Sequence, residues 1–109
     1  RGPAEIQLSI TVDSADRFEV VHCGRRIVYD AAEGSLSCCD RTAHCPTRNG
    51  AVEIRVIVDS YSLEIFADDG LAYMPMRVDR EDEPGVIRIG AFGGPIVVES
   101  LEVWGLEAS

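Results

Sequence analysis

Three observations predict that the chain folds as an all-β protein. Apolar residues alternate with polar ones along most of its length, and this period of two is typical of half-buried strands. Clusters of Gly, Pro, Asn and Asp interrupt the alternation at intervals of about 8 to 12 residues. No window of about 11 residues shows the i, i+3, i+4, i+7 apolar spacing of an amphipathic helix. We therefore expect about nine strands and no substantial helix.

The strands are expected in the following order. Ile6, Leu8, Ile10 and Val12 share one face of the first. Three short strands follow over 18–22, 25–30 and 35–39. Asn49-Gly50 is the strongest hairpin signal, because both residues tolerate positive φ, and it leads into a strand with Val52, Ile54, Val56 and Val58 on one face. After Leu63 and Ile65, the turns Asp68-Asp69-Gly70, 81–85 and Gly93-Gly94-Pro95 delimit strands over 71–76, 86–92 and 96–104.

Such strands are most simply buried in a two-sheet antiparallel β-sandwich of the jelly-roll or concanavalin-like type, since each strand then needs only one dry face. A small closed barrel is the alternative. The length of 109 residues predicts a single domain over residues 1–109. Because the chain opens with Arg1-Gly2-Pro3 and no Met, we expect it to be a fragment of a larger protein.

The charge of the chain excludes some partners. Ten basic and nineteen acidic residues give a formal charge of −9, which repels phosphate backbones and anionic lipid surfaces, so we expect no nucleic-acid partner. No apolar run approaches the roughly 20 residues of a membrane span, so we expect no membrane partner. The localisation stays open between extracellular and cytoplasmic.

Four cysteines, Cys23, Cys38, Cys39 and Cys45, are too few for a dense disulfide framework. We expect buried free thiols, because free Cys behaves as a small hydrophobe. One disulfide to Cys45 remains an alternative, although Cys38 and Cys39 are expected to point to opposite faces of a strand. The pairs His22-Cys23 and His44-Cys45 suggest a metal site, but their spacing matches no zinc motif, and we expect no cofactor.

The carboxylates around residues 58–70 raise the question of function. Alternation places Arg55, Asp59 and Glu64, with Phe66, on the face opposite the core. Tyr29-Asp30 and Asp40-Arg41 form a second polar cluster at strand ends. Carboxylate and guanidinium groups suit sugar hydroxyls, whereas structural ion pairs at a sheet edge are the simpler interpretation.

Catalytic interpretations are less well supported. Asp59 and Glu64 can lie at the separation that glycoside hydrolysis requires, but many acidic pairs can do so. Cys23 and Cys45 each follow a His, and neighbouring strand residues point to opposite faces, which disfavours a Cys-His dyad.

The run Val52 to Met76, VEIRVIVDSYSLEIFADDGLAYMPM, resembles the C-terminal β-sandwich of glycoside hydrolase family 32, the invertases and fructan hydrolases. The family pattern is close to L-R-(I/V)-x-V-D-x-x-S-(V/I/L)-E-(V/I)-F-x-x-D-G. Tyr29-Asp30, Leu36, Gly93-Gly94 and the closing Leu101-Glu102-Val103-Trp104 occur in the order that the family shows. The resemblance extends from about Phe18 to Leu106.

The resemblance implies a non-catalytic role for this chain. The catalytic residues of the family lie in an N-terminal β-propeller, in motifs of the W-x-N-D-P-N-G, R-D-P and E-C kind that are absent here. We expect an accessory sandwich that supports the propeller of a fructan or sucrose hydrolase. The alternative is a carbohydrate-binding module for levan or inulin, similar to family 66 modules. In that case Asp40, Arg41, Asp59 and Glu64 are the residues implied to bind fructan or a terminal fructose.

Overall fold

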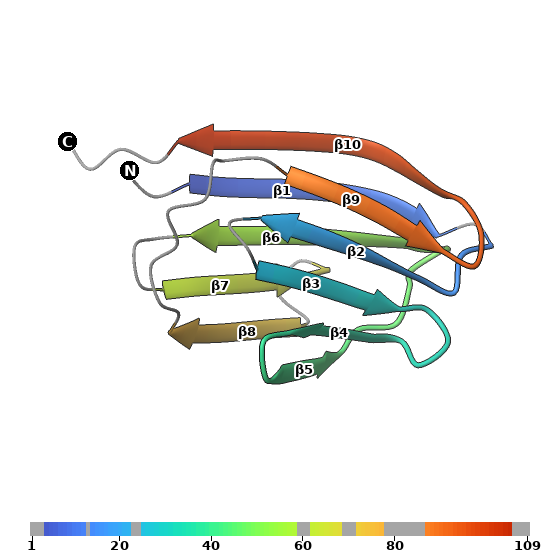
Figure 1. Ribbon diagram of the computed structural model, residues 1–109, viewed down its shortest axis with the longest axis horizontal. Coiled ribbons are helices and arrows are strands. Elements are labelled where there is room, and N and C mark those ends of the chain that lie inside the picture. The colour runs from blue at the N-terminus through green and yellow to red at the C-terminus, as the bar shows by residue number, and fades with distance from the viewer. Residues whose placement is uncertain are drawn as a thin grey trace.

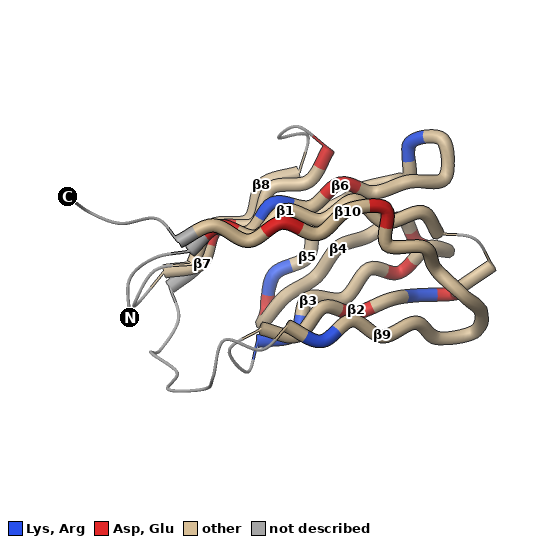
Figure 2. The backbone as a smooth tube through the Cα atoms, turned by 90° about the horizontal axis from the view of Figure 1, so that it is seen from above, with Lys and Arg blue, Asp and Glu red and all other residues tan. Residues whose placement is uncertain are grey.

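The computed structural model describes residues 4–12, 14–22, 25–58, 62–68, 72–77 and 87–105. Every regular element in this part of the chain is a β-strand, and the ten strands form two antiparallel sheets of five. Figure 2 shows the two sheets as two layers. The predicted all-β sandwich is confirmed. Among the described residues there is no helix of the length and apolarity needed to cross a membrane.

Sheet A contains both the first and the last strand of the chain. Its long strand β1 pairs on one side with β10 and on the other with β6, so residues about a hundred positions apart in sequence lie side by side (Figure 1). The order across sheet A is β10 (Ile96–Gly105), β1 (Ala4–Val12), β6 (Ala51–Val58), β7 (Ser62–Ala67) and β8 (Ala72–Arg77).

Sheet B is built largely from consecutive strands. Strands β2 to β5 follow one another as a meander, and β9 joins the sheet beside β2. The order across sheet B is β5 (Arg41–His44), β4 (Ser35–Cys38), β3 (Arg25–Asp30), β2 (Arg17–His22) and β9 (Ile87–Phe92).

The core lies between the sheets and consists of alternate strand residues from both. In β6 the buried residues are Val52, Ile54 and Val56, and in β7 they are Leu63, Ile65 and Ala67, as the period of two predicts. Each fully buried side chain of this size stabilises the fold by about 1.5–3 kcal/mol relative to exposure. The larger core residues from the remaining strands are Ile6, Leu8, Ile10, Phe18, Val20, Ile27, Tyr29, Leu36 and Met74.

Strand β5 is the one element for which the sequence holds no prediction. Its residues Arg41-Thr42-Ala43-His44 contain no alternation of large apolar and polar side chains, so periodicity has no signal there. The preceding strand β4 ends at Cys38, because Cys39 adopts a positive φ of 56° and turns the chain toward β5. In the described part of the chain the count is therefore ten strands rather than about nine.

Two glycine-containing turns have the backbone that their sequences predict. Asn49 and Gly50 have φ values of 55° and 77°, and Arg48 and Ala51 exchange two backbone hydrogen bonds of 2.9 and 3.0 Å across them. Positive φ at both central residues is the mark of a type I′ turn. Gly93, with φ of 82°, begins the turn that joins β9 to β10 across the two sheets.

The two long sides of the sandwich differ in how well they are closed. The edge strands β5 of sheet B and β8 of sheet A approach each other on one side. On the other side, β10 bears large apolar residues that sheet B leaves uncovered. Leu101 and Val103 lie opposite Leu8 and Ile6 in the register and so face the interior, yet 43% and 53% of their surfaces are exposed.

Candidate functional site

The outer face of sheet A, which points away from sheet B, carries a row of charged and aromatic side chains. Neighbouring strands contribute one side chain each, because Arg55 lies opposite Phe66 and Phe66 lies opposite Tyr73 in the register. Glu5 and Glu64 flank this row on β1 and β7. We call Glu5, Arg55, Phe66, Tyr73 and Glu64 the outer-face cluster.

The guanidinium of Arg55 is held on two sides. Its Nε lies 3.1 Å from Oε2 of Glu5, and its Cζ lies 4.9 Å from the centre of the Phe66 ring. The same Oε2 of Glu5 accepts a hydrogen bond of 2.7 Å from Nε2 of Gln7. The side chain of Glu5 is only 17% exposed, so the pair is partly shielded from solvent, whereas 48% of the Arg55 side chain remains exposed. An exposed but immobilised guanidinium can donate to a ligand with little loss of side-chain entropy.

The aromatic part of the cluster extends to the edge of sheet A. The rings of Phe66 and Tyr73 stack with centroids 4.8 Å apart and an interplanar angle of 26°. The hydroxyl of Tyr73 donates a hydrogen bond of 2.7 Å to Oε2 of Glu64. This bond, assisted by the charge of Glu64, raises the pKa of Tyr73, because the bond stabilises the protonated phenol. The guanidinium of Arg55 thus lies over the ring of Phe66, and the ring of Phe66 stacks on that of Tyr73, across the three strands β6, β7 and β8.

A groove of about 520 Å³ crosses this face beside the cluster. Such a volume lies within the range of about 300–1,000 Å³ found for small-molecule sites. Its lining combines both signs of charge with amide, hydroxyl and aromatic groups. The residues around it are Gln7, Leu8, Ser9, Glu53, Ile54, Arg55, Phe66, Asp68, Ser100 and Glu102.

Asp68, at one end of the groove, is a buried carboxylate that connects the two sheets. It is only 5% exposed, and its Oδ1 accepts a hydrogen bond of 3.3 Å from the backbone N–H of Glu53. Its Oδ2 accepts from the thiol of Cys45, 3.6 Å away, in the segment that follows β5. The sequence Asp68-Asp69-Gly70 predicts a turn, and the positive φ of 50° at Asp68 agrees with it, but no sequence pattern indicates that Asp68 is buried.

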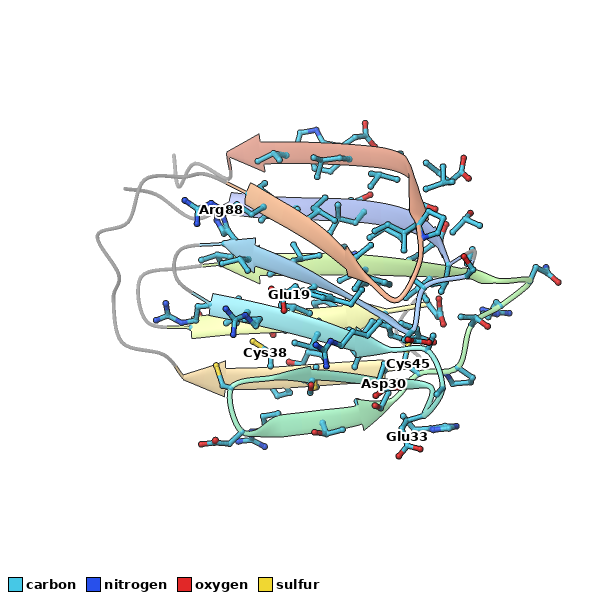
Figure 3. All side chains as sticks on the ribbon, turned by 45° about the vertical axis from the view of Figure 1, so that its right-hand side comes forward. Glu19, Asp30, Glu33, Cys38, Cys45 and Arg88 are labelled. Atoms are coloured by element: carbon cyan, nitrogen blue, oxygen red, sulfur yellow. The ribbon has the colours of Figure 1, made fainter. Side chains whose placement is uncertain are left out.

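Burial perturbs the ionisable groups around Asp68. The pKa of Cys45 rises to about 11, first because the thiol is buried and then because Asp68 is close. The hydroxyl of Tyr29 donates a hydrogen bond of 2.8 Å to the carbonyl of Cys45, and burial raises the pKa of Tyr29 to about 12. Figure 3 shows Cys45 beside the end of sheet B that carries Asp30. The thiol of Cys45 and the hydroxyl of Tyr29 remain protonated near neutral pH, which suits a structural role.

The structure separates the residues that the sequence singled out for sugar binding. Asp40 and Arg41 are exposed where β4 turns into β5, in sheet B. Glu64 is half-buried on the outer face of sheet A. Asp59 lies outside the described residues. Among the residues that the structure describes, neither Asp40 nor Arg41 shares a hydrogen bond or ion pair with Glu64, so the three do not form one constellation.

Arg55 and Phe66 were expected on the outer face, and the structure confirms that orientation. Glu5, Gln7 and Tyr73 join them, and no motif in the sequence distinguishes these three residues. Their outward parity can be read from the alternation in β1 and β8, but which strand pairs with which cannot. The pairing of β1 with β6 brings Gln7 opposite Arg55.

The cysteines differ from expectation in two respects: Cys38 and Cys39 lie together, and Cys39 is exposed rather than buried. Cys38 and Cys39 do not point to opposite faces, since their sulfur atoms lie 3.7 Å apart where the strand ends. Cys39 is exposed, whereas Cys38 and Cys45 are buried, and all three are free thiols; Cys23 lies outside the described residues. Burial and the neighbouring Cys39 raise the pKa of Cys38, so its thiolate is scarce. No group of three metal-ligating side chains occurs among the described residues.

Comparison with known proteins gives a family match and several structural neighbours. The model of the family described as "Glycosyl hydrolases family 32 C terminal" matches residues 2–105. None of the proteins with curated descriptions matches the chain.

Two of the similar structures are enzymes. A fructofuranosidase from Schwanniomyces occidentalis, solved with fructose, superposes with a TM-score of 0.73 at 15% identity over 94% of this chain and 28% of that one. An exo-inulinase from Aspergillus awamori gives a TM-score of 0.70 at 18% identity over 94% of this chain and 24% of that one. The chain therefore spans only about a quarter of the length of these enzymes.

Galectin LEC-6 from Caenorhabditis elegans is similar in fold over most of its length, with a TM-score of 0.65 at 16% identity over 94% of this chain and 83% of that one. At such identities these three structures show the fold, and the family match carries the relationship. The resemblance inferred from Val52 to Met76 is confirmed.

Proposed function

Because the chain belongs to the C-terminal family of glycosyl hydrolases family 32, we propose that it is the accessory sandwich of a longer hydrolase that acts on β-fructosides such as sucrose, inulin or levan. The chain itself is the non-catalytic module of that family. Its role in this proposal is to support an N-terminal catalytic β-propeller in the same polypeptide. The predicted domain over residues 1–109 is then one part of a larger enzyme.

The uncovered side of the sandwich is the observation that supports this role. We call Val98, Leu101 and Val103 the β10 strip; their surfaces are 40–53% exposed although the register turns them inward. Buried apolar surface stabilises by about 25 cal/mol per Å², so leaving such a strip in water forgoes stability that a covering surface would restore. A neighbouring domain of the same chain is the covering surface we propose.

Hydrogen exchange tests the accessory role. The amides of β10 are expected to exchange more slowly in the complete hydrolase than in the isolated chain, because a docked domain excludes water from the strip. Val103→Asp should remove that difference, and Thr42→Asp, on the exposed strand β5, is the matched control that should keep it. Equal exchange of β10 in the complete and isolated proteins would contradict the proposal.

Fructan binding is the second candidate function, and the exposure of charged groups at two places supports it. Asp40 and Arg41 are exposed at one turn, and Glu64 lies beside the exposed ring of Tyr73 on the other sheet. Asp40, Arg41, Asp59 and Glu64 stay predicted ligands for fructan or a terminal fructose. Titration calorimetry with levan, inulin and fructose tests them, and Glu64→Gln should abolish saturable heat while leaving the thermal midpoint almost unchanged.

A further inference from the structure

The two adjacent cysteines at the end of β4 lie with their sulfur atoms 3.7 Å apart (Figure 3). Neither the accessory role nor fructan binding uses these thiols. We propose that Cys38 and Cys39 form a chelating site for one thiophilic centre that bonds to two sulfur atoms, of the class of trivalent arsenicals. This inference goes beyond the accessory role, and it depends neither on that role nor on fructan binding.

The turn between β4 and β5 brings the two sulfur atoms together. Strand β4 ends at Cys38 and β5 begins at Arg41, so Cys39 and Asp40 form a two-residue hairpin loop. Of these two loop residues, Cys39 alone has a positive φ, of 56°. The first position of such a loop normally favours Gly, because a side chain is disfavoured at positive φ. This backbone departs from the alternation of a strand and leaves the sulfur of Cys39 beside that of Cys38.

The separation of the two thiols fits two bonds to one central atom. Two sulfur atoms bonded at about 2.3 Å to one centre, at an angle close to tetrahedral, lie about 3.8 Å apart, as in zinc thiolates. The distance of 3.7 Å between the thiols is close to this value, so a central atom can bridge them with little movement. A disulfide fits less well, because its Cα atoms are usually at least about 4.4 Å apart and those of adjacent residues are about 3.8 Å apart.

The surroundings select a centre that needs few ligands and creates no charge. Structural zinc takes four ligands, and the described residues contain no group of three metal-ligating side chains. Cys38 is only 2% exposed, so a complex with net negative charge is disfavoured there. A neutral arsenical R–As=O condenses with two protonated thiols, since two As–S bonds replace the As=O bond and the two S–H bonds. The oxygen and both protons leave as one water, and arsenic stays trivalent.

Access to the site is through Cys39. This thiol is exposed, whereas the thiol of Cys38 is buried. A reagent can therefore bond first to Cys39 and then to the neighbouring sulfur in an intramolecular step. The high effective concentration of the second thiol makes such a chelate much tighter than an adduct with one thiol. Cys45, which is buried and donates to Asp68, provides a single thiol for comparison.

The test titrates the reduced chain with phenylarsine oxide and follows the adduct by its intact mass. We expect one arsenical per chain, with the loss of one water. The adduct should persist in excess glutathione, a single thiol, and should be removed by dithiothreitol, which chelates in turn. The absence of an adduct, or an adduct that glutathione removes as readily as dithiothreitol does, would overturn the proposal.

The thermal midpoint shows whether the fold holds the pair for chelation. The two cysteines are adjacent in the unfolded chain as well, so a ligand raises the midpoint only if it binds the folded state more tightly. We expect phenylarsine oxide to raise the midpoint of the wild-type chain, because the turn already places both sulfur atoms. An unchanged or lowered midpoint at saturation would contradict the assignment.

Variants assign the adduct to this pair. Cys39→Gly removes one sulfur and places at positive φ the residue that tolerates it best, so stability should be retained while the affinity for phenylarsine oxide falls at least about a hundredfold. Cys23→Ser and Cys45→Ser are the matched controls, because each removes another thiol of the chain and should keep the adduct. Wild-type affinity in Cys39→Gly, or loss of the adduct in either control, would refute the assignment.

Discussion

Two carboxylates of the segment 62–68 lie in opposite environments. Asp68 is buried and connects the sheets through Glu53 and Cys45, whereas Glu64 stands on the outer face and accepts from Tyr73. Both carboxylates come from the same short stretch of sequence. The two carboxylates are therefore satisfied in different ways: Asp68 by hydrogen bonds in the interior, and Glu64 by a hydrogen bond on the outer face.

The Glu64 contact predicts a shift in tyrosine ionisation. In Glu64→Gln the negative charge is lost, so the protonated phenol of Tyr73 is favoured less and its pKa should fall toward the ordinary value. A spectrophotometric titration of the phenolate band measures this change. Tyr73→Phe identifies which component belongs to Tyr73, and an unchanged titration curve in Glu64→Gln would contradict the hydrogen bond.

The groups around Asp68 predict a loss of stability in alkali. The pKa of Cys45 is 9.0 when unperturbed and about 11 in the fold, and that of Tyr29 is 10.0 and about 12. The folded state thus holds protons that the unfolded state releases, so the contribution of these two groups to the free energy of unfolding is constant below about pH 9 and decreases as the pH rises to about 12. Denaturant unfolding over this range measures the decrease. Cys45→Ser keeps a donor for Asp68 but does not titrate, and it should lessen the decrease between pH 9 and 11.

At the scale of elements, the turn between β9 and β10 is more constrained than the sequence signal Gly93-Gly94-Pro95 alone implies. Gly93 has positive φ, and a Cβ added to it would collide with the carboxylate of Asp16. Gly50 also has positive φ, but a Cβ there would meet no atom within 4 Å. A side chain at Gly50 would therefore meet only the cost of a left-handed backbone, whereas a side chain at Gly93 would meet that cost and a steric conflict.

Alanine substitution at the two glycines should therefore have unequal effects. Gly50→Ala should lower the free energy of unfolding by about 1–2 kcal/mol, the cost of a left-handed backbone for a residue with a Cβ. Gly93→Ala should lower it further, because the clash with Asp16 is added to that cost. Equal losses in chemical denaturation would show that the Asp16 side chain yields freely.

Strand positions and the outward parity of Arg55 and Phe66 follow from the sequence, because a period of two fixes which side chains share a face. Other features depend on partners that lie far away in sequence. The burial of Asp68 requires Cys45, and the fixing of Arg55 requires Glu5 from the first strand. Strand β5 forms by pairing with the edge of β4, and its own residues have no alternating pattern that predicts a strand.

At the scale of the whole molecule, the sandwich is well packed in its middle and open along β10. Leu8 and Leu101 are direct cross-strand neighbours that face the same interior, but they are 3% and 43% exposed. The same residue type thus occurs in two environments, one buried in the core and one exposed along β10.

This pair gives a matched test of the open side. Leu8→Ala should lower the free energy of unfolding of the isolated chain by about 2–5 kcal/mol, because it leaves a cavity in the core. Leu101→Ala should cost less than about 1 kcal/mol in the isolated chain, and more in the complete hydrolase if the strip is covered there. Losses of equal size in the isolated chain would mean that β10 is already packed.

The position of β1 between β6 and β10 has a consequence for how the chain folds. Its pairing with β10 joins Ala4 to Gly105, so sheet A cannot be completed until nearly the whole chain has been synthesised. Contacts between such distant residues slow folding, because a long loop must close before they form. During translation the edge of β1 that pairs with β10 therefore stays unpaired until β10 has been made. Removal of β10 should expose that edge to association with other chains.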